Sequence, residues 1–426
     1  MFRNFLMDKG MNLNSSLPKS IFFLGSLQAI NYIVPLLVLP VIISGLGMTQ
    51  FGVLALCVSI TNYFVILVDF GFNMLATKEA SENRTNNSYL SELFFKVISI
   101  KIIFSIILFF ILSLLAQRVD IINDNIDILR ILFLIVISQA INPLWFFTGL
   151  EDLQHFTIIN ALGRLVYLIL IISLINSEGD IFYAALITSL VPLIVSLVLS
   201  LDAINKYNLK YVSLSLSRNI AYSKSSFDLF LTNIFTSIYI NLPTIIVGQF
   251  FGYSSVGLYA TAEKIILAFK NIYSPISQAI YPYLANVASQ SPQIAKNTIF
   301  RFLSWYIVLG LVMAIFIYVF SEEMVLLIAG NEYPGAIQLL KLMALLPLFF
   351  GVSNLFGTNT LLVFGYRKQF FYSLFLGSIF GGSALFVSGI MFSVDEVALS
   401  ILITEVLICC IMYIQIYKLK VFKLHG

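Results

Sequence analysis

Long apolar runs, separated by short clusters of charged and turn-forming residues, follow one another along the whole chain. A helix needs about 20 consecutive, mostly apolar residues to cross a bilayer. Twelve runs of this kind can be counted, at residues 20–46, 51–77, 93–116, 129–149, 156–175, 181–203, 226–251, 255–288, 298–320, 336–364, 369–392 and 397–417. The pattern therefore predicts an all-α integral membrane protein with about twelve transmembrane helices. The eighth run is the longest, and we expect Pro275 and Pro282 to kink it.

The composition leads to the same class of protein. Of the 426 residues, 59% are hydrophobic and only 11% are charged, whereas a soluble domain carries roughly 25% charged residues. No solvated basic domain is present, so nucleic acid is not expected as a partner. The first apolar run is too long for a signal-peptide core of about 7–15 residues, and we expect it to persist as the first membrane span.

Positive charges are distributed unequally between the two sides of the predicted topology. Twelve spans put both termini on one side, where sixteen Lys and Arg residues fall, while the opposite loops and their flanks hold only Arg118 and Arg130. Because an excess of Lys and Arg marks cytoplasmic loops, both termini are predicted to be cytoplasmic, in a multi-pass protein of the bacterial inner membrane.

The chain divides into two halves that share a sequence pattern. We expect an N-terminal six-helix bundle over 1–203, a cytoplasmic linker over 204–225 and a C-terminal six-helix bundle over 226–426. The segments "LGMTQFGVLAL" and "FGYSSVGLYAT" both place glycines five residues apart, about 205 residues from one another. "NPLWFFTGLEDLQ" and "NTLLVFGYRKQ" form a second, shorter echo. Chance similarity of Gly-rich loops is the alternative to a parallel repeat, which is common in secondary transporters that bind substrate between the halves.

Three charged residues, Glu263, Lys264 and Lys270, lie well inside the eighth run. One charge at the bilayer centre costs about 2.5–3.5 kcal/mol, so all three would cost on the order of 8–10 kcal/mol if they faced lipid. Their spacing instead places them on one polar face of the helix, because seven residues are close to two helical turns. The two stripes of this face are Glu263, Lys270 and Ser277, and Lys264, Asn271 and Gln278.

Other predicted spans also contain ionisable residues. Bases outnumber acids within the spans, which suits an anionic cargo such as a pyrophosphate headgroup. The bases are Lys101, Arg164, Lys264, Lys270 and Lys341, and the acids are Asp69, Glu263 and Glu405. Structural alternatives stay open: Lys101 and Lys341 can reach the interfaces, Asp69 can cap a helix, Lys264 and Lys270 can pair with Glu263, and Glu405 can serve as a proton relay or as the partner of a lysine.

Catalytic chemistry is not apparent in the sequence. Cys57, Cys409 and Cys410 lie in apolar runs without metal-ligand spacing, and neither His155 nor His425 has neighbours that suggest a triad or a metal site. There is no phosphate-binding glycine loop of the Walker type, and no large extramembrane loop. We therefore expect a transporter, with no metal and no cofactor, rather than an enzyme.

Several segments, in order and at the expected spacing, resemble the Wzx-type polysaccharide (O-antigen) flippases of the multidrug/oligosaccharidyl-lipid/polysaccharide (MOP) exporter superfamily. They are "VPLLVLPVIISGLGMTQFGVLAL", "DFGFNMLATKEAS", "QAINPLWFFTGLED" and "VGLYATAEKIILAFKNIYSPISQAIYPYLA". The resemblance implies two six-helix bundles around a V-shaped, MATE-like central cavity that opens to each side in turn. It also implies an undecaprenyl-pyrophosphate-linked oligosaccharide as cargo, moved from the cytoplasmic to the periplasmic leaflet.

The resemblance also assigns candidate roles. The cationic cavity of the family corresponds to Lys264, Lys270 and Arg164, with Asn271 and Gln278 on the same polar face. Coupling to an H⁺ or Na⁺ gradient would involve Asp69, Glu263 or Glu405. Implied partners are membrane lipids and the polymerase and chain-length regulator of the same pathway. The alternatives are a multidrug exporter or a lipid II flippase of the same superfamily, and, in another class, a membrane-embedded polymerase.

Overall fold

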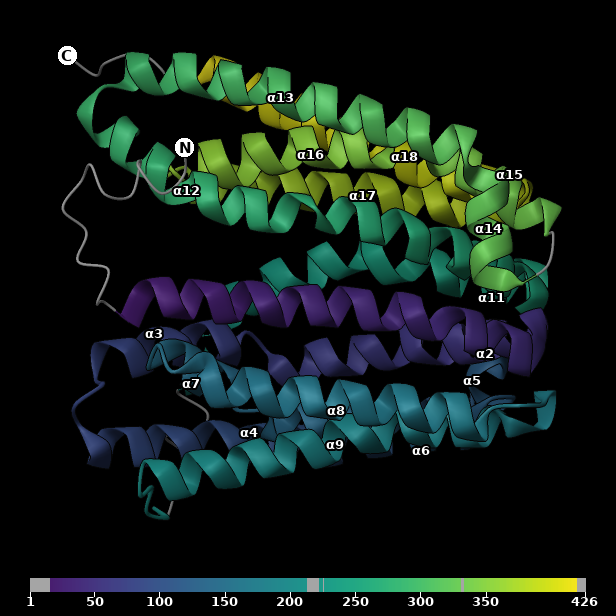
Figure 1. Ribbon diagram of the computed structural model, residues 1–426, viewed down its shortest axis with the longest axis horizontal. Helices are drawn as coiled ribbons and strands as arrows, with labels where there is room; N and C mark the ends of the chain where they lie inside the picture. Colours follow the sequence, from purple (N-terminus) through teal and green to yellow (C-terminus); the bar gives the residue numbers. More distant parts are fainter. Residues whose placement is uncertain (1–15, 213–221, 225, 331–332, 420–426) are drawn as a thin grey trace.

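The computed structural model describes residues 16–212, 222–224, 226–330 and 333–419, and within these ranges the chain is helical without any strand. The predicted linker, 204–225, is only partly covered, because residues 213–221 and 225 lie outside the described residues. Figure 1 shows helices running side by side in two groups, with the first half of the chain in the lower part of the view and the second half in the upper part.

The described helices of the first half are α2 (Ser16–Asp69), α3 (Phe72–Glu82), α4 (Asn87–Ala116), α5 (Asp120–Asn123), α6 (Ile126–Ile141), α7 (Leu144–Gly149), α8 (Leu153–Leu174), the short 3₁₀ turn Glu178–Asp180 and α9 (Ile181–Lys206). Those of the second half are α11 (Phe227–Asn271), α12 (Tyr273–Gln290), α13 (Pro292–Val319), α14 (Ser321–Ala329), α15 (Pro334–Met343), α16 (Leu346–Phe356), the π-helical turn Gly357–Leu361, α17 (Arg367–Met391) and α18 (Val394–Lys418).

The longest helix of each half turns back on itself at a glycine. In α2 the backbone leaves the helical region at Gly47 (φ 72°, ψ 164°), and in α11 it does so at Gly252 (φ 81°, ψ 172°). Figure 1 shows both helices reaching the right-hand end of the molecule and returning. The same left-handed geometry, which glycine adopts without strain, thus recurs at the two positions that the sequence echo aligns. Each helix supplies two arms, and each arm is long enough to cross a bilayer.

Within the described ranges, nine helical segments are long and apolar enough to span a membrane. That count takes the two arms of α2 as one segment and leaves out α11 and α12. Dividing α2 at Gly47 and adding the two arms of α11, the second continued by α12, gives the twelve crossings that the apolar runs predicted. The all-α membrane fold is therefore confirmed.

Three of the crossings contain a break in the helix, and each break sets the direction of the helical segment that follows it. Prediction placed residues 51–77 in one helix, but Phe70 and Gly71 adopt positive φ and separate α2 from α3. The fourth crossing is divided at Asn142–Pro143, because proline cannot continue the hydrogen-bond ladder of α6. In the eighth crossing the helix breaks at Ile272, three residues before Pro275, whereas Pro282 lies inside α12.

The two halves are joined mainly along α2 and α11, which form the most extensive helix–helix contact in the molecule. The largest apolar cluster of buried side chains includes residues of both helices, such as Leu46, Leu56, Val247 and Val256. Smaller clusters belong to one half alone, around Trp145 in the first and around Tyr273 in the second. Each half thus has its own core, and a shared seam connects them.

Candidate functional site

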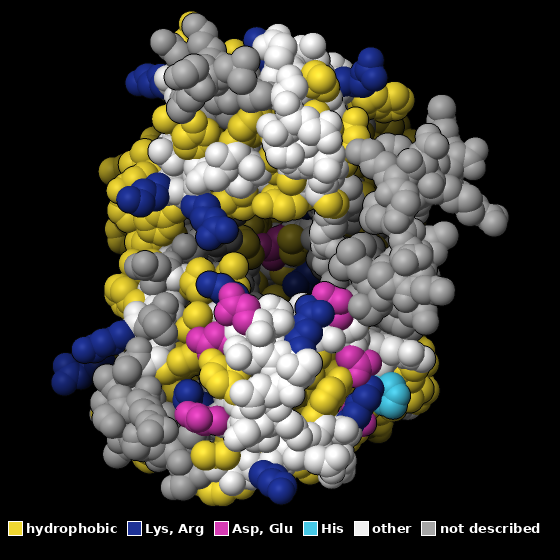
Figure 2. Space-filling model, turned by 90° about the vertical axis from the view of Figure 1, so that its left-hand side faces the viewer, with side chains coloured by type: hydrophobic (Ala, Val, Ile, Leu, Met, Phe, Trp, Pro, Cys, Tyr) yellow, Lys and Arg dark blue, Asp and Glu magenta, His cyan; other side chains and the backbone are white. Residues whose placement is uncertain are grey.

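The end of the molecule at which α2 begins and α18 ends is hollowed between the two halves. Figure 2 looks onto this end and shows an opening in its centre, with Lys or Arg and Asp or Glu side chains around the mouth and inside it. Polar side chains deep in such a hollow face water or a polar ligand rather than lipid. This is the candidate site, and the charged face of the eighth crossing belongs to the seam beside it.

Lys270 is held in the second half of the molecule by a carboxylate from the last helix. Its Nζ donates a hydrogen bond to Glu405 Oε1 at 3.3 Å and lies 4.5 Å from the centre of the Phe350 ring. The second carboxylate oxygen of Glu405 accepts from Ser353 Oγ at 3.5 Å. The Lys270 side chain is 13% exposed and that of Glu405 only 3%. The ammonium group therefore has one charged partner, an aromatic face below it and a path to solvent.

Lys264 lies one and a half helical turns before Lys270 in the same helix and is half-buried. In the part of the chain that the structure describes, no hydrogen bond or ion pair engages its ammonium group. Glu263 is also half-buried and feels the positive charges of both lysines, although no ion pair within 4.0 Å joins it to either. The alternative in which the two lysines pair with Glu263 is thus not observed; Lys270 pairs instead with Glu405, for which a lysine partner was one of the two alternatives.

The uncharged members of the predicted polar face lie where the two halves approach each other. Asn271 is half-buried at the end of α11, and Gln278 is exposed on α12. Gln278 Nε2 donates to Ser274 Oγ at 3.3 Å, and Ser274 in turn donates to Gln28 Oε1 of α2 at 3.1 Å. This chain of hydrogen bonds connects the polar face of the second half with the first arm of α2.

The remaining predicted residues of the first half lie in two places. Arg164 is half-buried on α8, near Tyr167. Asp69 lies at the end of α2, and its Oδ1 accepts from Lys101 Nζ at 2.9 Å. Lys101 is fully buried and does not extend to the membrane interface as the alternative interpretation proposed. Asp69, Glu263 and Glu405 therefore do not form one cluster.

The charges inside the membrane are more evenly balanced than the sequence count indicated. Lys101 is paired with Asp69, Lys270 with Glu405, and Lys341 with Glu322 at 3.1 Å. Glu322 belongs to the first turn of α14, outside the predicted spans, so the count of acids missed it. Three of the five bases counted within the predicted spans, Lys101, Lys270 and Lys341, therefore have a carboxylate partner.

Hydrogen bonds between the ends of the first-half helices fix the loop before α8. Lys206 Nζ lies 2.5 Å from Asp152 Oδ2, and the hydroxyl group of Tyr207 also donates to that oxygen. Burial alone would raise the pKa of Asp152, but the hydrogen bonds from Lys206 and Tyr207 lower it overall. Arg84 on the loop after α3 pairs with Glu151 at 2.7 Å. These contacts hold the ends of the first-half helices in place.

The opposite end is closed by close packing of the two kinked helices. A Cβ atom on Gly52 would lie 1.9 Å from the carbonyl oxygen of Tyr253, and one on Gly257 would lie 2.2 Å from that of Met48. Asn125 Nδ2, in the loop before α6, donates to the hydroxyl group of Tyr253 at 3.0 Å. Gly52 of α2 packs against α11, and Gly257 of α11 packs against α2. We call this pair of contacts the glycine clasp. It permits a backbone approach that no larger residue allows.

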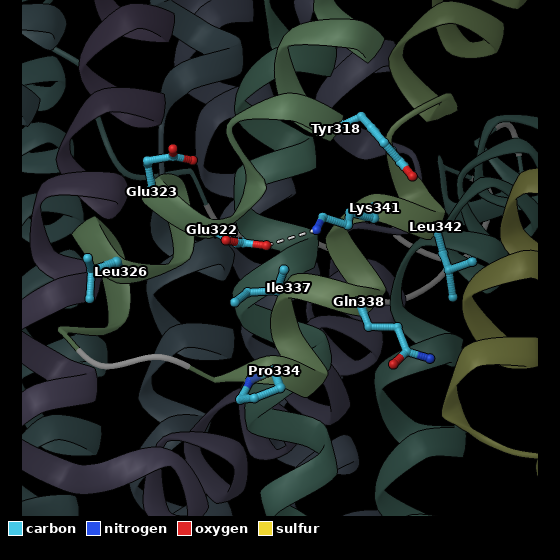
Figure 3. Close-up of a pocket in the computed structure, with 9 residues that line it drawn as sticks. All are labelled: Tyr318, Glu322, Glu323, Leu326, Pro334, Ile337, Gln338, Lys341 and Leu342. Atoms are coloured by element: carbon cyan, nitrogen blue, oxygen red, sulfur yellow. Dashed lines mark hydrogen bonds and ion pairs between the residues drawn. The ribbon is translucent and has the colours of Figure 1, made fainter.

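A second cavity lies near this closed end, within the second half. It has a volume of about 820 Å³ and is formed by α13, α14 and α15. Figure 3 shows Lys341 reaching toward Glu322 across it, with Tyr318 and Gln338 to one side. The residues that line it are Tyr318, Glu322, Glu323, Leu326, Pro334, Ile337, Gln338, Lys341 and Leu342. Lys341 thus belongs to this cavity and not to the central hollow.

Sequence reasoning missed the neutral residues that surround Lys270. Phe350 and Ser353 come from α16, whose sequence "LPLFFGVSNLF" reads as an ordinary apolar segment. The signal was the run of small and polar residues that ends α16 and enters the π-helical turn. Such turns are rare in proteins, and those that occur are often found at functional sites. Among the described residues, no group of three or more His, Cys, Asp or Glu side chains could hold a metal ion.

The profile of the family described as "Polysaccharide biosynthesis protein" matches residues 17–288. Two proteins named "Putative O-antigen transporter", from Escherichia coli (strain K12) and Shigella dysenteriae, are 26% and 24% identical to the chain; the alignments cover 94% and 92% of this chain and 97% and 98% of those relatives. Among solved structures, an inward-facing multidrug resistance MATE family transporter of the MOP superfamily matches with a TM-score of 0.72 at 14% identity, over 92% of this chain and 94% of that one. This likeness shows that the fold is that of the MOP superfamily.

Proposed function

Because this chain belongs to the polysaccharide biosynthesis protein family, we propose that it is a transporter that moves a lipid-linked oligosaccharide across the membrane. The cargo is an undecaprenyl-pyrophosphate-linked repeat unit of an O-antigen or capsule, carried from the cytoplasmic to the periplasmic leaflet of the bacterial inner membrane. The names of the two curated relatives support the class of cargo. The asymmetric distribution of Lys and Arg supports a cytoplasmic location for both termini.

The observation that carries the proposal is the hollow at one end of the molecule (Figure 2), together with two half-buried lysines on the second arm of α11. The hollow is closed at the far end by the glycine clasp, as alternating access requires of a state that is open to one side only. Among the described residues no hydrogen-bond or ion-pair partner engages the Lys264 ammonium group, and Lys270 is partly exposed. Two such groups suit the two phosphates of a pyrophosphate headgroup, which Lys binds as a point charge.

The cargo and Glu405 compete for the same ammonium group in this mechanism. In the present state Lys270 is neutralised by the carboxylate, and a pyrophosphate must take over this contact to bind. A proton or another cation on Glu405 removes the competing negative charge and favours binding. Glu405 and Glu263 are thus the proposed points of coupling to an ion gradient. The polymerase and chain-length regulator of the same pathway are the proposed protein partners.

Replacement of the two lysines tests the proposal in a strain that lacks the gene and is complemented with variants. We expect Lys264→Ala and Lys270→Ala each to lower surface polysaccharide by at least several-fold, and the double variant to abolish it, relative to the amount of each variant in the membrane. This correction is needed because loss of Lys270 also removes the charged partner of Glu405. Lys341→Ala is the matched control, because it removes a lysine from the other cavity. Surface polysaccharide is measured by gel and by antibody.

Two results would contradict the proposal. Normal surface polysaccharide in the double variant would remove the role of the lysines in binding the headgroup. A broad gain in drug sensitivity of the deletion strain, with unchanged polysaccharide, would favour the multidrug exporter instead.

A further inference from the structure

The ammonium group of Lys101 occupies a site built like that of a bound cation. Lys101 lies in the middle of α4 and is fully buried. Its Nζ donates to Asp69 Oδ1 at 2.9 Å and to Asn73 Oδ1 at 2.7 Å. One carboxylate and one amide oxygen converge on a single positive charge, and oxygen ligands of this kind also bind small metal cations in proteins.

The two oxygen-bearing residues belong to a broken helix. Asp69 is the last residue of α2 and Asn73 lies in the first turn of α3, with Phe70 and Gly71 at positive φ between them. The C-terminal end of a helix carries partial negative charge and carbonyl groups without an intrahelical partner. In membrane transporters the ends of interrupted helices coordinate coupling cations in this way. The N-terminal end of α3, which begins at Phe72, carries the opposite partial charge, so the preference of this break for a cation comes mainly from the Asp69 carboxylate.

The break is fixed by the second half of the molecule. A Cβ atom on Gly71 would lie 2.8 Å from Leu229 Cβ and 2.9 Å from the Ser226 carbonyl oxygen, at the beginning of α11. The Phe70 ring stacks on that of Phe230 in α11, with 4.4 Å between the centroids. The site thus lies at the seam where the two halves meet, so its occupancy matters for the contact between them.

The two ion pairs differ in which partner is enclosed. The Lys101 side chain is fully buried, whereas that of Asp69 is 13% exposed. The Phe104 ring packs beside the break, 5.4 Å from the ring of Phe70 and 6.1 Å from that of Phe72, measured between centroids. In the second half it is the Lys270 side chain that is 13% exposed, and it has a single carboxylate partner. The ammonium group of the first half is therefore fully enclosed, whereas that of the second half is not.

We propose that Asp69 and Asn73 form a monovalent-cation site that Lys101 fills permanently as a tethered cation. The first half of the molecule then takes up no exchangeable ion. The statement about the exchangeable ion rests on the proposed transport function. In that transport cycle, the coupling ion is taken up by the second half at Glu405 or Glu263. Asp69 is accordingly a structural anion of the seam and not a coupling residue.

Removal of the tethered charge should convert the site into one that binds an added ion. We expect purified Lys101→Ala to unfold at a lower Tm than the unaltered protein in choline chloride. NaCl or KCl at the same ionic strength should raise the Tm of the variant by several degrees in a saturable way, since a ligand that binds only the folded state stabilises it. The Tm of the unaltered protein should rise less, because in that protein only the second half can take up an added ion.

The double variant Lys101→Ala/Asp69→Asn is the matched control. It lacks the carboxylate, so its Tm should exceed that of the single variant in choline chloride and should respond to NaCl or KCl no more than the Tm of the unaltered protein does. Radioactive sodium binding gives a second readout if the single variant is too unstable for melting in choline chloride. We expect one more bound ion per chain in Lys101→Ala than in the unaltered protein, and none more in the double variant.

An equally low Tm of Lys101→Ala in every salt, without additional bound ion, would overturn the inference and leave the contact as a structural ion pair only. Neither readout requires the glycolipid. Failure here therefore leaves the proposed transport function intact, and failure of the Lys264 and Lys270 variants to affect polysaccharide leaves this inference intact.

Discussion

Lys264 and Lys270 belong to one helix, yet their ammonium groups are in different electrostatic states. Lys270 is bonded to Glu405 and lies over the Phe350 ring, a contact worth about 0.5–2 kcal/mol. Lys264 has no partner of either kind among the described residues. In the proposed mechanism a negatively charged headgroup can bind Lys264 without displacing a described protein partner, whereas it gains Lys270 only by displacing the carboxylate. Binding and ion coupling would then be linked through one residue, Glu405.

The buried pair leads to a prediction on stability. Lys270→Met leaves the buried Glu405 carboxylate without its charged partner, with only the hydrogen bond from Ser353, and breaking a buried ion pair in this way costs about 3–5 kcal/mol. We expect Lys270→Met to lower the Tm, and the additional change Glu405→Leu to restore most of it, because an apolar pair of similar volume replaces two charges. Both variants should fail in transport.

Thermal unfolding of the purified proteins checks this prediction, with Lys341→Met as the control for loss of a more exposed lysine. A double variant that melts no higher than Lys270→Met would show that the cost does not come from the unpaired carboxylate.

At the level of single residues, the sequence identified the anomalous charges but not their partners. A charge in an apolar run is visible in one segment, whereas Lys101 pairs with a residue 32 positions away and Lys270 with one 135 positions away. Such pairs depend on which helix faces lie together. The excess of bases was overestimated for the same reason, because Glu322, the partner of Lys341, lies outside any predicted span.

At the level of helices, the predicted limits agree with the observed ones to within a few residues in most crossings, since bilayer thickness fixes their length. The breaks were harder to predict. The one at Asn142–Pro143 had a local signal, because proline and the residue before it disfavour the helix. The one at Gly71 had none comparable, since it depends on packing against α11.

The glycine clasp yields a prediction at this scale. A methyl group on Gly52 would lie 1.9 Å from the carbonyl oxygen of Tyr253, so Gly52→Ala must push the kinked ends of α2 and α11 apart. We expect the variant to favour a state that is open at the clasp end. Gly25→Ala is the control, because nothing lies within 4 Å of a Cβ atom there.

Thiol labelling measures this shift in a background in which the three native cysteines are replaced by alanine. A cysteine at Ser274, on the polar face of α12, is treated with a membrane-impermeant reagent from the side of the clasp. We expect faster labelling with Gly52→Ala than with Gly25→Ala. Equal labelling rates at equal protein levels would contradict a role of the clasp in closing that end.

At the level of the whole molecule, the architecture was predictable and the conformation was not. Twelve apolar runs and two glycine pairs were sufficient for the membrane fold and for the equivalence of Gly47 and Gly252, which adopt the same backbone geometry. Which end is open depends on the balance of contacts between the halves at the two ends. The clasp and the Asn125–Tyr253 hydrogen bond hold the two halves together at one end, and the Ser274–Gln28 contact connects them toward the other. No single segment determines this balance.

Alternating access predicts that holding the clasp end closed stops transport. Asn125 and Tyr253 come from different halves and touch at this end, so cysteines at both positions can be joined by a short, membrane-permeant bis-methanethiosulfonate reagent. We expect cross-linking to abolish export of the polysaccharide unit and a reducing agent to restore it, because the link is made of disulfides. Cysteines at Ser138 and Ser196 are the control: their hydroxyl oxygens are 3.0 Å apart, on two helices of the first half. Linking them should leave export nearly unchanged, since the halves move as units. If the link between Asn125 and Tyr253 forms in full and export continues, the two halves do not part at this end, and the cargo must cross the membrane by a route other than the central hollow.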